Sequence, residues 1–166
     1  FQGEPVIVDL STSTGGYIVT AAAGTSMVGV LNGVVFTDAS TLKPTFSNFY
    51  PAATTPANSE DITAFVNDDP FQEYIIATDA TLGGTLALRK SKIGLTYATT
   101  AAAGSTATGK SSIQLGISTG ATTAKQLRVV RVAEDPENQD QTAANCSLVV
   151  KVNLHQYTVG SLATGI

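Results

Sequence analysis

Few side chains in this sequence are able to carry out chemistry. The chain has one cysteine, Cys146, and one histidine, His155, nine positions apart with a predicted strand between them. A zinc site needs further His or Cys ligands, and nucleophilic catalysis needs a nucleophile placed beside its base, so we expect neither. A single cysteine also excludes an internal disulfide framework. We interpret Cys146 as a small buried hydrophobic residue, and His155, on the opposite face, as a structural hydrogen-bonding group.

Residues Gly104–Ser111 match the spacing of a phosphate-binding loop, in which Gly and four further residues precede Gly-Lys-Ser. That loop needs a buried strand directly before it and a helix directly after it. Here residues 97–103 are too small and polar for a core strand, and residues 112–117 alternate like a strand. We interpret the match as chance in a sequence rich in Gly, Ser and Thr, and expect no nucleotide or other cofactor.

Three short charged clusters have structural interpretations. Asn67–Pro70 offers three side chains with oxygen atoms, but a calcium site needs six to eight oxygen ligands, so we predict a turn. Arg89–Lys92 holds three cations without interleaved aromatic residues, which favours a solvated loop over a nucleic-acid patch. Glu134–Asp140 concentrates four acids around a proline and is predicted to be exposed surface. We therefore expect no catalytic, cofactor-binding or metal-binding residues.

The composition points to β-structure. Of 166 residues, 43% are hydrophobic and 13% are charged, with 24 Thr, 13 Ser and 15 Gly. Thr and Val suit a pleated surface, and Gly and Ser suit reversals of the chain. A net charge of −4 argues against a nucleic-acid partner, which requires a basic face. No stretch approaches the roughly 18 apolar residues of a membrane helix, so we expect no membrane partner.

Strand-like periodicity recurs along almost the whole chain. We predict one all-β domain over residues 1–166, a mainly antiparallel β-barrel or β-sandwich with long loops and little helix. Asn32-Gly33 permits a hairpin, but we favour one long strand in which Gly29 and Gly33 mark bulges or a close approach of backbone. The predicted strands are Val6–Leu10, Tyr17–Thr20, Met27–Phe36, Ile62–Val66, Phe71–Ala77, Leu82–Leu88, Ser112–Ile117, Gln126–Ala133 and Asn145–Gln156.

One segment crowds three aromatic residues, Phe46, Phe49 and Tyr50, between Pro44 and Pro51. Proline cannot donate a ladder hydrogen bond and holds the preceding residue extended, so we predict an ordered excursion rather than a central strand. Leaving three aromatic rings exposed to water would be unfavourable in free energy. They either cover the core of their own domain or form an interface with another subunit or protein, and we favour the interface.

The order of motifs resembles a known family. FQGEPV at residues 1–6 is similar to an F-x-G-(D/E)-P-V opening. VGVLNG at 28–33, followed by PTFSNFYP at 44–51, resembles a passage with GV-x-x-G and then P-x-F-S-x-x-(Y/W)-P. AFVNDDP at 64–70, LRVV at 127–130 and VNLHQ at 152–156 resemble its later motifs. These motifs are similar to those of the head stabilisation (decoration or cement) proteins of tailed bacteriophages.

The resemblance implies a structural virion protein on the outer surface of the capsid. Such a protein binds and bridges neighbouring major capsid protein subunits and carries no enzymatic activity. It implies a symmetric homo-oligomer, for which we favour a homotrimer over a homodimer. Members of the family carry a segment before the F-x-G opening, so a removed or disordered N-terminal arm upstream of Phe1 would explain the absence of an initial Met.

Two other classes of function are compatible with parts of the sequence. The stronger alternative is a β-rich adhesin or receptor-binding module of a tail fibre or bacterial surface, although the chain has no Trp and only five Tyr for aromatic platforms. A hydrolase or nucleotide enzyme is the least favoured, because only the match at Gly104–Ser111 supports it.

Overall fold

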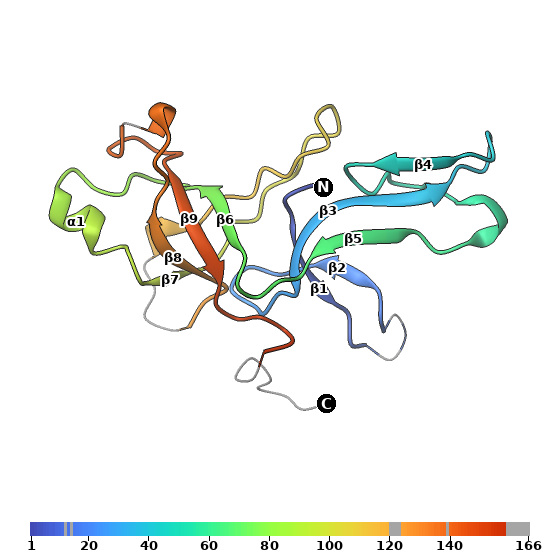
Figure 1. The fold of residues 1–166 in the computed structure, drawn as a ribbon, viewed down its shortest axis with the longest axis horizontal. Coiled ribbons are helices and arrows are strands. Elements are labelled where there is room, and N and C mark those ends of the chain that lie inside the picture. Colours follow the sequence, from blue (N-terminus) through green and yellow to red (C-terminus); the bar gives the residue numbers. More distant parts are fainter. Residues whose placement is uncertain (12, 14, 120–123, 139, 159–166) are drawn as a thin grey trace.

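A computed structural model describes residues 1–11, 13, 15–119, 124–138 and 140–158. These residues form two antiparallel sheets with very little helix, which confirms the predicted fold class. Neither sheet closes into a barrel within the described residues, so the arrangement is sandwich-like (Figure 1).

The first sheet is built around one long strand. It contains β1 (Pro5–Val8), β2 (Ile18–Thr20), β3 (Gly29–Thr37), β4 (Pro44–Ser47) and β5 (Thr63–Asn67). The order is β2-β1-β3-β4. β1 pairs with the start of β3 and β4 pairs with its end, and β5 pairs with β3 along the opposite edge. The first part of the aromatic excursion therefore forms the edge strand β4, with Pro44 at its first residue, where proline is tolerated, and Phe49 and Tyr50 follow the strand.

The second sheet has the order β6-β9-β8-β7. Its strands are β6 (Glu73–Ala77), β7 (Thr96–Tyr97), β8 (Leu127–Val132) and β9 (Ser147–Val152). The predicted turn Asn67–Pro70 begins at the last residue of β5 and leads toward β6, so it carries the chain from one sheet to the other. Asp69 supports this turn, because its Oδ1 accepts a hydrogen bond from the Phe71 N–H at 2.8 Å.

Two predicted strands are wrong. In place of the strand Leu82–Leu88, residues 82–85 form a loop that leads into α1 (Leu86–Lys90). The Thr85 hydroxyl accepts from the Leu88 N–H and caps a run of good helix formers. Residues 112–117 form no strand. Leu115 makes only single bridges, to Thr78 and to Thr99. The other helical pieces are the 3₁₀ turns η1 (Ala57–Ser59), η2 (Ile117–Thr119) and η3 (Pro136–Asn138).

β3 is continuous, as predicted, and contains a bulge. Its register with β5 shifts between Leu31 and Gly33. Gly29 permits the close pairing at its start, because an added Cβ would collide with the Asn67 carbonyl oxygen and lie 3.0 Å from the Asp68 Cα. The backbone of β3 therefore accepts no side chain at this position.

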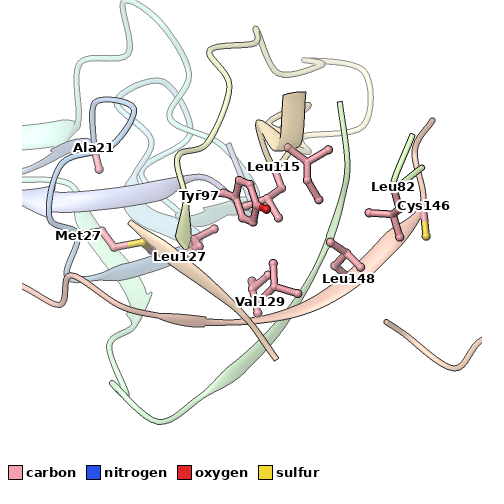
Figure 2. Packing of buried hydrophobic residues seen from close by; sticks show 11 residues of the cluster. Ala21, Met27, Leu82, Tyr97, Leu115, Leu127, Val129, Cys146 and Leu148 are labelled. Atoms are coloured by element: carbon pink, nitrogen blue, oxygen red, sulfur yellow. The ribbon is translucent and has the colours of Figure 1, made fainter. Parts of the chain in front are cut away.

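The main core lies on one face of the second sheet (Figure 2). Leu148, Val150 and Val129 pack there with Tyr97 and with Leu115. Met27 from the first half of the chain joins this cluster, and Ile7 and Val30 of the first sheet pack against it. Cys146 is a buried member, as predicted, and burial raises the pKa of its thiol. A smaller cluster on the first sheet contains Val6, Val28, Leu31, Val34 and Phe36.

Replacing Gly29 with Ala tests the close approach of β3 to the turn after β5. We expect the free energy of unfolding to fall by about 1–3 kcal/mol, because backbone atoms must move to admit the methyl group. Gly84→Ala is the matched control, since nothing lies within 4 Å of a Cβ built there. Urea unfolding of both variants measures the difference, and equal stability of the two would contradict the packing described for Gly29.

Candidate interaction surfaces

The structure separates the three aromatic residues predicted to form an interface. Phe46 projects from β4, 57% exposed, beside Phe65 of β5, which is 47% exposed. Their ring centroids are 6.2 Å apart. Phe46 pairs with Val35 and Phe65 with Gly33, so both rings lie on the face opposite the smaller core cluster. Phe46 covers Gly33, where an added Cβ would lie 2.5 Å from the ring Cζ.

Phe49 has a different environment, inside the protein's own fold. Its ring stacks on Phe1 with centroids 5.4 Å apart and an interplanar angle of 15°. The Phe1 ring in turn lies against Gly104, where a Cβ would collide with it. The Phe1 ammonium donates to Glu4 Oε2 at 2.8 Å. Phe49 therefore holds the N-terminal residues in place.

The segment Gly104–Ser111 forms a tight hairpin that packs on the N-terminal residues. Gly109 N–H donates to the Ser105 carbonyl at 2.7 Å, and Ser111 N–H donates to the Gln2 carbonyl at 2.8 Å. In the described stretch 98–119, no strand directly precedes the hairpin and no α-helix follows it. Gly104 gives space for Phe1, and Gly109, with a positive φ of 69°, gives space for Asn48. Both glycines thus have a structural role here.

The other face of the first sheet holds an apolar groove with a cavity of about 770 Å³. Val6, Leu31, Val34, Ile62 and Ala64 line it, and Tyr17, Tyr50, Glu60 and Asp61 lie around it. The Tyr17 hydroxyl donates to Asp61 Oδ1 at 3.0 Å, which joins the residue before β2 to the segment before β5. This hydrogen bond and the Asp61 charge raise the pKa of Tyr17. Tyr50 is exposed and belongs to this groove, away from the Phe46–Phe65 pair.

His155 makes structural hydrogen bonds, as predicted, and it is buried. Its Nδ1 accepts from the Tyr157 N–H at 3.2 Å, and its Nε2 lies 2.9 Å from the Asp68 carbonyl oxygen. Through these two contacts the ring joins the segment after β9 to the turn after β5. Within the described residues, no three His, Cys, Asp or Glu side chains are grouped to hold a metal ion. No described helix is long and apolar enough to cross a membrane.

The charged clusters lie at the surface. Arg89 and Lys90 end α1, so they belong to a short helix and not to a loop. The acidic residues Glu134, Asp135 and Glu137 are exposed around η3, as predicted. Sequence reasoning missed Phe65 and the groove. A signal for Phe65 was present, because alternation in β5 places it on the face opposite Ala64 and Val66.

No known family model, curated protein or solved structure matches this chain. Function must therefore be inferred from the surfaces of the chain and from its sequence motifs.

The different environments of Phe49 and Phe46 predict different effects of truncation. Phe49→Ala removes the ring that stacks on Phe1, and we expect the free energy of unfolding to fall by about 1–3 kcal/mol. Phe46→Ala should cost about 1 kcal/mol or less, as is typical of an exposed cross-strand pair. Thermal melts of the two purified variants give the comparison. A larger loss for Phe46→Ala than for Phe49→Ala would contradict these assignments.

Proposed function

We propose that this protein is a structural virion protein that binds the outer surface of a tailed-phage capsid. In this role it bridges neighbouring major capsid protein subunits and stabilises the head. The exposed Phe46–Phe65 pair is the observation on which the proposed contact rests. The motif resemblance to head stabilisation proteins supplies the identity of the partner. The proposal assigns the protein no reaction and no cofactor.

Two exposed phenylalanines on a sheet face are suited to anchor a protein interface. Aromatic side chains bury large area at small entropic cost, and a few such residues supply most of the binding energy of an interface. The strands beneath them are fixed by ladder hydrogen bonds to β3, so the rings are already positioned before binding. We propose Phe46 and Phe65 as the capsid contact, with Tyr50 on a separate surface and Phe49 as a structural support.

A capsid repeats one surface many times, which favours a binder of moderate affinity. Several linked contacts on one shell raise the overall affinity without any new type of interaction. We therefore propose that the protein acts as a symmetric homo-oligomer, a homotrimer being favoured over a homodimer.

Substitution of the paired rings tests the contact. We expect Phe46→Ser and Phe65→Ser each to weaken binding to undecorated heads by at least about tenfold, because each removes an anchor. Phe71→Ser is the matched control, since Phe71 is also exposed but lies outside the pair. Co-sedimentation with heads measures binding, and thermal melts confirm folding. Folded variants that bind like the control would refute the assigned contact.

Removal of the protein from the virion tests the stabilising role. Heads without it should open at a lower temperature than decorated heads, because a ligand that binds only the assembled shell stabilises that shell by mass action. Adding back purified protein should restore the opening temperature. If decorated and undecorated heads open at the same temperature, the protein is not a cement protein.

A second candidate is an adhesin or receptor-binding module, and the groove beside Tyr17 and Tyr50 is the observation that favours it. Electron microscopy of particles separates the two candidates. Density on the head supports the capsid role, whereas density on a tail fibre supports the alternative.

A further inference from the structure

We propose that the groove of the first sheet is a docking site for residues 86–95 of a second copy of this chain. Chains would then associate head to tail. The inference extends the self-association included in the proposed function, but its test uses purified protein alone and needs no capsid.

The groove presents an apolar floor with an acidic edge. Leu31, Val34 and Ile62 contribute to the floor, and Glu60 and Asp61 are the carboxylates beside it. Among the described residues neither carboxylate forms an ion pair. Lys43 is the only Lys or Arg in residues 1–67, so the first sheet offers little basic charge of its own to balance them. The occupant that fits is an apolar segment carrying cations.

Residues 86–95 of the same chain have this chemistry. Leu86 and Leu88 are 57% and 53% exposed, and Ile93 and Leu95 are also exposed. Lys90 and Lys92 lie between them, and residues 80–133 contain no Asp or Glu. Neither lysine forms an ion pair with a described residue. Arg89 is only half-exposed and its Nε is buried, so we assign the contact with the groove to Lys90, which is exposed, and to Lys92.

The segment is held in shape before any docking. Thr85 caps the start of α1 through the Leu88 N–H, and Ser91 N–H donates to the Ala87 carbonyl. After the helix, Gly94 N–H donates to the Val129 carbonyl at 2.9 Å, and Val129 N–H donates to the Leu95 carbonyl at 2.9 Å. These two bonds fix Gly94 and Leu95 against β8, and the Lys92 and Ile93 N–H groups donate back to carbonyls of the helix. A segment positioned in this way loses little conformational freedom when it binds.

The two surfaces cannot meet within one chain. α1 lies at one end of the long axis of the molecule, whereas the segment just before β5, which contains Glu60 and Asp61, lies at the other end (Figure 1). The contact must therefore join different molecules. A contact between two different surfaces closes into a ring when the rotation between copies permits it, and such a ring is one form of the symmetric oligomer proposed above.

Charge reversal on each surface, followed by reversal of both, tests the contact. The variants are Lys90→Glu with Lys92→Glu, Glu60→Lys with Asp61→Lys, and the combination of all four changes. Lys43→Glu with Lys110→Glu is the matched control, because both lysines are exposed, lie outside the two surfaces and give the same change in net charge as the first variant. Sedimentation over a range of protein concentrations, at low and high salt, gives the mass and the dissociation constant.

We expect the unaltered protein to form a closed oligomer that weakens as salt rises. Each double reversal should raise the dissociation constant by at least about tenfold relative to the control. The combined variant should regain association, and the two double variants should associate when mixed. Leu86→Ser with Leu88→Ser should also weaken association, because the apolar part of the contact is lost.

Several results would overturn the inference. The first is an unaltered protein that stays monomeric at every concentration. The second is a lysine reversal with the same dissociation constant as the control. The third is folded double variants that do not associate when they are mixed. If the groove variant instead loses only binding to heads, the groove is occupied by the capsid and self-docking is refuted. Loss of self-association with intact capsid binding in these variants leaves the proposed function standing. An unaltered protein that self-associates through this contact but does not bind heads leaves the contact standing and overturns the proposed function.

Discussion

The pairing of β3 with three other strands is the interaction on which the rest of the structure depends. This one strand bonds to β1 near its start, to β4 near its end and to β5 along its other edge. Its side chains also supply both clusters, because Val30 packs against the main core while Leu31 and Val34 belong to the smaller one. The bulge after Leu31 shifts the register with β5 between the two ends of the strand. Gly29 lets the strand approach the Asn67 backbone closely enough for this arrangement.

The two sheets bury their apolar faces unequally, and the interaction surfaces follow from this difference. The second sheet covers its inner face with a large cluster to which the first sheet also contributes Ile7 and Val30. The first sheet keeps a smaller cluster beside a groove on one face and an exposed aromatic pair on the other. Single exposed apolar residues are ordinary, but an apolar groove and a ring pair on two faces of one sheet are larger features, and the proposed contacts rest on them. The proposed capsid contact and the proposed self-contact use these two faces separately.

Two glycines leave space for aromatic rings to pack against the backbone. Gly33 lies beneath Phe46, and Gly104 lies against Phe1. At each place the absence of a side chain leaves space for a ring on the backbone. Phe1 in turn supports Phe49, so the N-terminal residues, the aromatic segment and the hairpin at 104–111 form one packed unit. The two glycines that match a phosphate loop in sequence, Gly104 and Gly109, therefore have a packing role.

Local chemistry in the sequence was enough to determine the β class, most strands, the continuous bulged β3, the turn at Asn67–Pro70 and the burial of Cys146. Each depends on alternation or turn preference within a few neighbouring residues. The tertiary structure alone decided which surfaces Phe46, Phe49 and Tyr50 belong to, and where the groove lies. It also decided that Leu115 makes single bridges to Thr78 and Thr99 without forming a strand. These features depend on residues far apart in the chain, such as Phe1 with Gly104 or Tyr17 with Asp61. Periodicity along one strand carries no information about which distant segment lies against it.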